Sequence, residues 1–71
     1  MPIEEGLAWA IPPDDQDFQV GTLFVRLRTN ELLIVAFVEP ENAVVWFHSK
    51  MLLERFSFEY AKTLFARVSE V

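Results

Sequence analysis

The chain has no cysteine, a single histidine and only two glycines among its 71 residues. Without cysteine it forms no disulfide, holds no thiolate-bound metal and has no thiol nucleophile. One histidine excludes a multi-histidine metal site, and two widely separated glycines exclude a glycine-rich phosphate-binding loop. We therefore expect neither a metal nor a cofactor in this protein.

Long apolar runs are also missing. The longest uninterrupted run has seven residues, 32–38, whereas a membrane-spanning helix needs roughly 20. The N-terminus lacks a basic region followed by an apolar core, so a secretory signal is not expected. These features predict a cytoplasmic protein with no membrane association.

Positive charge is scarce and unevenly distributed. Six lysines and arginines oppose eleven acids, giving a net charge of −5, and the first 20 residues carry five of the acids and no base. An acidic balance argues against general nucleic-acid binding, because such binding depends on neutralising phosphates. The acidic segment is interpreted as solvated, with a basic partner surface as the alternative.

Apolar residues are present in excess. Hydrophobic residues make up 52% of the chain, a composition typical of a folded protein. Residues 32–38 are all apolar, and so are residues 43–47. A strand with one solvated face alternates between apolar and polar residues, so these segments predict a sheet with both faces covered. A chain this short has little material for that purpose, which indicates a partner subunit or a folded-over sheet.

Three segments are predicted as strands: 20–28, 31–38 and 43–48. Turn residues separate them, namely Thr29-Asn30 after the first and a loop containing Pro40 and Asn42 after the second. Asn42 tolerates the left-handed backbone conformation that closes such a loop. The result is an antiparallel meander in which Arg28 lies opposite Glu31.

The meander divides its side chains between two faces. The first face is purely apolar and is predicted to form the main core: Leu23, Val25, Leu27, Leu32, Ile34, Ala36 and Val38. The second face is apolar in the middle and charged at one end: Phe24, Arg26, Arg28, Leu33, Val35 and Phe37. The length of the Pro40 loop decides whether Trp46 and His48 or Val45 and Phe47 join the second face.

The C-terminal third predicts a helix over roughly 58–69. Ala61, Leu64, Phe65 and Val68 share one stripe of it and would cover the first face. A fourth strand over 54–60 is the alternative, because residues there alternate as well. Ser49 is a candidate cap for a short helix through 51–53.

The fold class is therefore α+β, a three-stranded antiparallel β-meander with a C-terminal helix. The alternative is a small SH3-like β-barrel. Residues 1–19 are interpreted as an acidic, irregular N-terminal arm and residues 20–71 as a single domain.

Catalysis is not expected. His48 is the one available imidazole, and its neighbour Ser49 points to the opposite face of the predicted strand, so the two do not form a nucleophile–base pair. Asp14 and Asp15 lie in a predicted loop, without the apolar surroundings that raise a carboxyl pKa for acid catalysis.

The apolar surplus on the second face predicts a non-catalytic protein-binding module, an adaptor, subunit or inhibitor, with a protein partner or a second copy of the chain. The predicted partner-binding residues are Phe24, Leu33, Val35, Phe37, Trp46 and Trp9. The competing hypothesis is that Trp9 and Ile11 fold back over this face. A second hypothesis is a single-stranded nucleic-acid-binding module that uses Arg26, Arg28 and Trp46.

Overall fold

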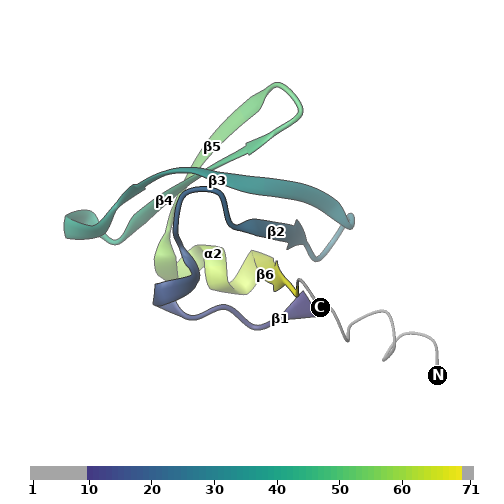
Figure 1. Cartoon of the computed structure of the whole chain (residues 1–71), viewed down its shortest axis with the longest axis horizontal. Helices are drawn as coiled ribbons and strands as arrows, with labels where there is room; N and C mark the ends of the chain where they lie inside the picture. Colours follow the sequence, from purple (N-terminus) through teal and green to yellow (C-terminus); the bar gives the residue numbers. More distant parts are fainter. Residues whose placement is uncertain (1–9, 70–71) are drawn as a thin grey trace.

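The structure is a computed structural model that describes residues 10–69 (Figure 1). Within this range six strands form one antiparallel sheet in the order β1-β6-β2-β3-β4-β5. The strands are β1 (Ala10–Ile11), β2 (Leu23–Arg26), β3 (Glu31–Glu39), β4 (Val44–Ser49), β5 (Leu52–Ser57) and β6 (Phe65–Val68). One α-helix, α2 (Phe58–Leu64), and two 3-10 turns, η1 (Asp15–Asp17) and η2 (Pro40–Asn42), complete the described elements.

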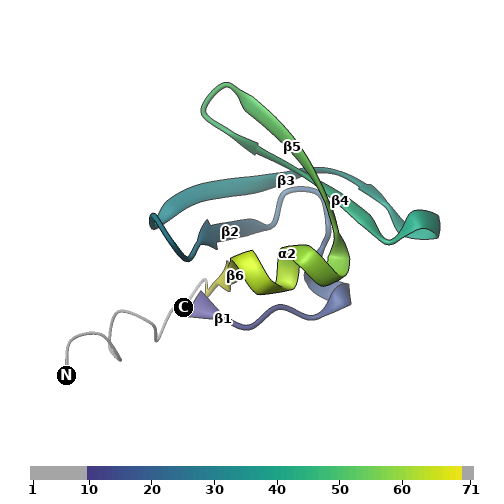
Figure 2. The same ribbon diagram turned by 180° about the vertical axis from the view of Figure 1, so that it is seen from behind.

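The α+β class is confirmed, but the predicted three-stranded meander is an undercount. Strands β2, β3 and β4 form the meander, β5 extends it, and β6 and β1 add to its other side. The sheet curls over α2 (Figure 2). It does not close into a barrel, so the SH3-like alternative is not what the chain adopts.

The β2–β3 hairpin has a longer turn than the sequence predicted. Its turn spans residues 27–30, with the amide of Asn30 donating to the Arg26 carbonyl at 2.7 Å and Asn30 itself at φ 63°. Arg26, not Arg28, therefore lies opposite Glu31. This corrects the predicted register by two residues, an even offset, so each side chain of the paired segments 23–26 and 31–34 stays on its predicted face.

A β-bulge in β3 changes the faces after Val35. Val35 pairs with Phe47, but the next paired residue is Phe37, opposite Trp46, so Ala36 is the extra residue. The bulge shifts the alternation by one position. Phe37 consequently lies on the face opposite to Leu33 and Val35, which corrects its predicted placement.

The segment after β4 combines both predictions for the C-terminal third. A tight β4–β5 hairpin turns at Lys50, with φ 52°, in place of the predicted short helix after Ser49. The Ser57 hydroxyl then accepts a hydrogen bond from the Tyr60 amide at 3.1 Å and caps α2. The helix ends at Leu64, earlier than predicted, because the following residues pair with β2 and β1 as strand β6.

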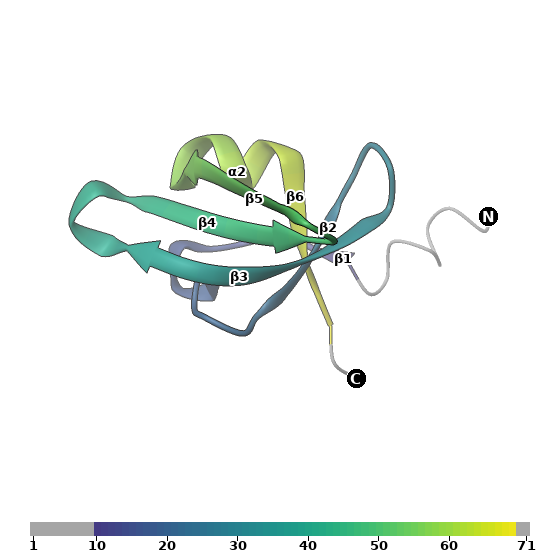
Figure 3. The same ribbon diagram turned by 90° about the horizontal axis from the view of Figure 1, so that it is seen from above.

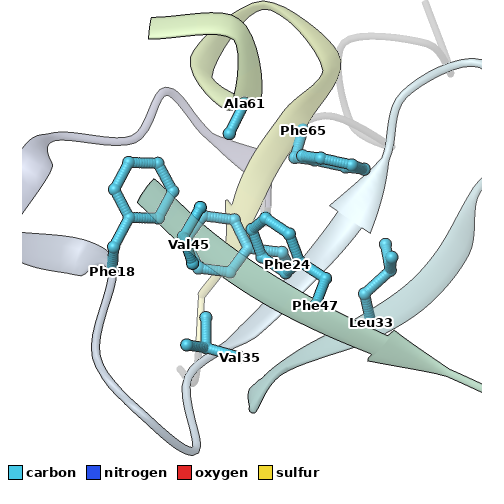
Figure 4. Close-up of a cluster of buried hydrophobic side chains, with 8 residues drawn as sticks. All are labelled: Phe18, Phe24, Leu33, Val35, Val45, Phe47, Ala61 and Phe65. Carbon is cyan, nitrogen blue, oxygen red and sulfur yellow. The ribbon is translucent and has the colours of Figure 1, made fainter. Parts of the chain in front are cut away.

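The hydrophobic core lies between α2 and the sheet face that carries the phenylalanines (Figure 4). Its buried residues are Phe18, Phe24, Leu33, Val35, Val45, Phe47, Ala61 and Phe65. Ring centroids of Phe47 lie 5.2 Å from Phe24 and 4.6 Å from Phe65. We call this the inner face. It is the second face of the sequence analysis, so the predicted assignment of the main core was wrong.

The inner face forms the core because its aromatic side chains bury more apolar area than the aliphatic side chains on the opposite face. Part of the predicted arm also contributes to the body of the domain. Phe18, which follows η1, stacks on Phe24 at 5.3 Å and on Phe58 at 4.8 Å. Ile11 pairs with Arg67 in the sheet, and Trp9 lies outside the described residues. Phe18 thus supplies the cover that was expected of Trp9 and Ile11.

Candidate protein-interaction face

The sheet face opposite to the core carries a group of exposed, large apolar side chains. They are Leu23, Leu32, Ile34, Phe37 and Leu53, with exposed fractions of 43, 57, 39, 56 and 52%. We call these five residues the outer face. Seen from above, α2 lies on one side of β3 and β4 (Figure 3), and Ala61 of that helix is buried in the core on the inner face. The outer face is therefore the side of these strands that the helix leaves uncovered.

The register places most of these side chains in one row across four strands. Leu23 pairs with Ile34, Ile34 with His48, and His48 with Leu53. Directly opposed residues on neighbouring strands stand about 4.5–5.5 Å apart, so the row is continuous. His48 is exposed and lies in its middle.

A second row contains the polar part of this side of the sheet. Phe37 pairs with Trp46, and Trp46 with Arg55, whose guanidinium carbon lies 5.9 Å from the centroid of the Trp46 ring. The Trp46 indole Nε1 donates to Glu39 Oε2 at 2.6 Å, and Asn42 Nδ2 donates to Glu39 Oε1 at 2.9 Å. These contacts fix the Trp46 ring beside the apolar row.

The pKa of Glu39 is lowered from its ordinary value of 4.5 in this environment. The main cause is the hydrogen bond from Trp46, followed by that from Asn42, with a smaller contribution from Arg55. Because the folded-state pKa lies below the unfolded one, the carboxylate favours the folded state above pH 4.5. This contribution is lost as the pH falls through the lowered pKa.

This arrangement predicts a titration that can be followed at a single proton. We expect the Trp46 indole N–H resonance to stay constant from pH 7 down to 4.5 and to move upfield only at lower pH, when Glu39 is protonated. Two-dimensional NMR at a series of pH values measures it, and Glu39→Gln removes the transition. A midpoint at or above 4.5 would contradict the hydrogen-bonded carboxylate.

One of the two arginines in the nucleic-acid hypothesis, Arg26, already forms two ion pairs within the domain. Arg26 Nη2 donates to Glu54 at 2.7 Å and Nε to Glu31 at 3.2 Å, while the guanidinium lies 5.3 Å from the Phe65 ring centroid. The pKa of Arg26 is raised, mainly by the hydrogen bond to Glu54. Strand alternation places Arg26 on the inner face and Trp46 on the outer side, so the predicted residues do not share one surface.

The acidic residues near the N-terminus are partly neutralised by the domain itself. Lys62 of α2 lies 2.5 Å from Asp15, and Arg67 of β6 lies 3.1 Å from Asp17. The Asp15 hydrogen bond is the main cause of the raised pKa of Lys62. These ion pairs hold η1 against α2 and β6, so part of the acidic charge that was predicted to be solvated is paired within the domain.

Of the residues predicted to bind a partner, Phe24, Leu33 and Val35 are buried to 2% exposure or less and cannot form a docking surface. Phe37 and Trp46 do lie together on the outer side of the sheet, and Trp9 falls outside the described residues. Sequence reasoning missed the aliphatic members of the outer face: Leu23, Leu32, Ile34 and Leu53. The uninterrupted apolar run indicates that both faces of the strand are apolar, but it does not indicate which of the two faces forms the core.

In residues 10–69 there is no group of three His, Cys, Asp or Glu side chains that could hold a metal ion. The helix in the same range is too short and too polar to span a membrane. Comparison of the chain with known protein families, with curated proteins and with solved structures finds no match to any of them.

Proposed function

We propose that this protein is a non-catalytic protein-binding module, of the adaptor, subunit or inhibitor kind, and that its outer face is the docking surface. The observation that supports the proposal is the row Leu23–Ile34–Leu53 with Leu32 and Phe37 beside it, all large apolar side chains at 39–57% exposure. The main hydrophobic core lies on the other side of the sheet. The exposed part of these side chains is therefore available to another protein.

The size of the outer face agrees with this role. Five half-exposed Leu, Ile and Phe side chains present on the order of 500 Å² of apolar surface, the scale at which patches on soluble proteins coincide with interfaces. A standard interface covers about 800 Å² on each partner. Trp46 and Arg55 lie beside the apolar row and His48 lies within it, and these three side chains would supply the polar contacts that make up the difference.

The surroundings of His48 favour binding over chemistry. Its direct cross-strand neighbours are Ile34 and Leu53, and neither can orient an imidazole or exchange a proton with it. Ser49 is buried at 4% exposure and faces the inner side of the sheet. A histidine among aliphatic side chains suits an interface that excludes water.

A charge on the outer face is expected to weaken docking. Phe37→Glu would place an unpaired carboxylate in the contact, and we expect partner binding to weaken by about tenfold or more. Tagged wild-type and variant proteins would be compared in capture from native lysate with quantitative mass spectrometry. Sedimentation velocity over a range of concentrations would measure self-association in parallel.

Tyr60→Glu is the matched control. Tyr60 is also an aromatic residue at 56% exposure, but it lies on α2 at the inner side of the sheet. The proposal expects Tyr60→Glu to keep the partner that Phe37→Glu loses. Equal retention by all three proteins, together with a monomeric wild type, would refute docking at the outer face.

A further inference from the structure

Strand β5 forms one edge of the sheet, and every second residue of it directs its backbone groups away from β4. The Phe58 amide donates to the Ala43 carbonyl at 2.8 Å, which identifies the pair Ala43–Phe58 as a hydrogen-bonded pair of the β4–β5 ladder. Hydrogen-bonded and non-hydrogen-bonded pairs alternate along antiparallel strands. The pairs His48–Leu53 and Trp46–Arg55 are therefore of the non-bonded type.

It follows that Leu53 and Arg55 direct their N–H and C=O groups away from β4. The figures agree that this edge is accessible, because the tip of the β4–β5 hairpin extends away from α2 and β6 (Figures 1 and 2). Unpaired edges of this kind accept an additional strand. Glycine and proline, which would disrupt such pairing, are absent from Leu52–Ser57.

A groove lies directly beside the inner side of this edge, where the curled sheet fails to close. It has a volume of about 400 Å³ and is formed by β5, α2 and the β2–β3 turn. Its lining residues are Arg26, Arg28, Thr29, Glu54, Phe56, Tyr60 and Leu64. Phe56 and Tyr60, whose ring centroids are 5.8 Å apart, and Leu64 give it an apolar wall.

Arg28 is the second arginine that lines the groove. Arg26 is neutralised by Glu31 and Glu54, so these three groups together leave one negative charge. Arg28 is exposed and makes no ion pair with any residue between 10 and 69. An anionic group that enters from the β2–β3 end would meet the Arg28 guanidinium, for which a carboxylate is the natural partner.

We propose that β5 and this groove bind an extended peptide segment that adds a strand to the sheet and carries an apolar residue and an acidic residue two positions apart. Residues two apart share one face of a strand. The apolar side chain then lies on Phe56, Tyr60 and Leu64, and the carboxylate reaches Arg28. Backbone hydrogen bonds to Leu53 and Arg55 supply affinity that is independent of side chains, as in other cases of strand addition.

A synthetic peptide tests the proposal. The probe is a fluorescein-labelled peptide, Ser-Thr-Phe-Thr-Glu-Thr-Ser, titrated with the full chain by fluorescence anisotropy. We expect saturable binding with a Kd on the order of 100 µM. The same peptide with lysine in place of glutamate should bind about tenfold more weakly. Arg28→Glu should reverse this preference, because it exchanges the sign of the charge at the groove.

A backbone variant separates strand addition from simple side-chain contact. Leu53→Pro removes one outward N–H but leaves the hydrogen bonds to β4, whereas Leu53→Val keeps that N–H. Binding should fall at least tenfold in the first variant and stay within about twofold in the second. Far-ultraviolet circular dichroism checks that both variants fold. If Leu53→Pro does not fold, the charge reversal by Arg28→Glu, which lies in an exposed turn, still tests the proposal.

Three results would overturn this proposal: no anisotropy change at 1 mM protein, equal binding of the glutamate and lysine peptides, or self-association through β5 that Leu53→Pro abolishes while the peptide does not bind. The site uses the backbone of Leu53 and Arg55 at the sheet edge and the groove on the inner side, and it does not include Phe37. Phe37→Glu is expected to leave peptide binding unchanged, whereas Tyr60→Glu, which alters the groove, is expected to weaken it. Failure of one proposal can therefore be distinguished from failure of the other.

Discussion

Replacing Phe47 with alanine is expected to lower the free energy of unfolding by about 3–5 kcal/mol. Phe47 has no exposed surface, and its ring lies within 6.3 Å of the rings of Phe18, Phe24, Phe56 and Phe65. Alanine would remove the side chain on which these rings converge and leave a cavity that they fill only in part. A domain of 71 residues has a total stability of about 4–10 kcal/mol, so the loss is a large share of it.

Urea unfolding at 25 °C, followed by circular dichroism, measures this effect. Phe37→Ala is the control, because it removes the same atoms from a side chain that is 56% exposed on the outer face. We expect the control to lose less than about 1 kcal/mol. Similar losses at the two positions would mean that the core does not lie on the inner face.

Replacing Arg26 with leucine is the second change with a large expected effect. The Arg26 side chain is 20% exposed, and it separates the carboxylates of Glu31 and Glu54, which are 29 and 26% exposed. Leucine would leave these two negative charges facing each other without a cation. We expect a loss of about 2 kcal/mol, less than the 3–5 kcal/mol measured for fully buried pairs because water screens part of the repulsion.

The cause of that loss can be isolated by removing the charges that Arg26 balances. A triple variant, Arg26→Leu with Glu31→Gln and Glu54→Gln, should recover at least half of the lost stability. If the triple variant is as unstable as the single one, the contact of the Arg26 guanidinium with the Phe65 ring matters more than the balance of charge.

Local patterns predicted much of the strand layout. The apolar runs and the turn residues located β3 and β4, and the division of Leu23, Phe24, Leu33 and Ile34 between two faces was correct. This division of side chains was correct although the predicted turn was too short, because the resulting error in register was two residues, an even number. Within β3 the side chains after Val35 were assigned to the wrong faces, because no residue type in this segment indicates a bulge at Ala36.

The candidate site was harder to predict than the strands. Both faces of β3 are apolar, so periodicity alone cannot decide which one the protein buries. That choice depends on contacts distant in sequence, in particular Phe18 stacking on Phe24 and Phe65 meeting Phe47. The short strand β6 is a further case, because residues 65–68 fit a helical pattern until their pairing with β2 and β1 overrides it.

The bulge at Ala36 also bears on how the length of this chain can change. Loss of one residue from a strand normally turns every following side chain to the wrong side. Ala36 is the exception, because without it Val35 would still face the core, Phe37 would still face outward and Val38 would still meet Val45. Deletion of Ala36 is therefore expected to leave every later side chain of β3 on the face that it now occupies. The exposed position of Phe37 does not depend on the presence of Ala36.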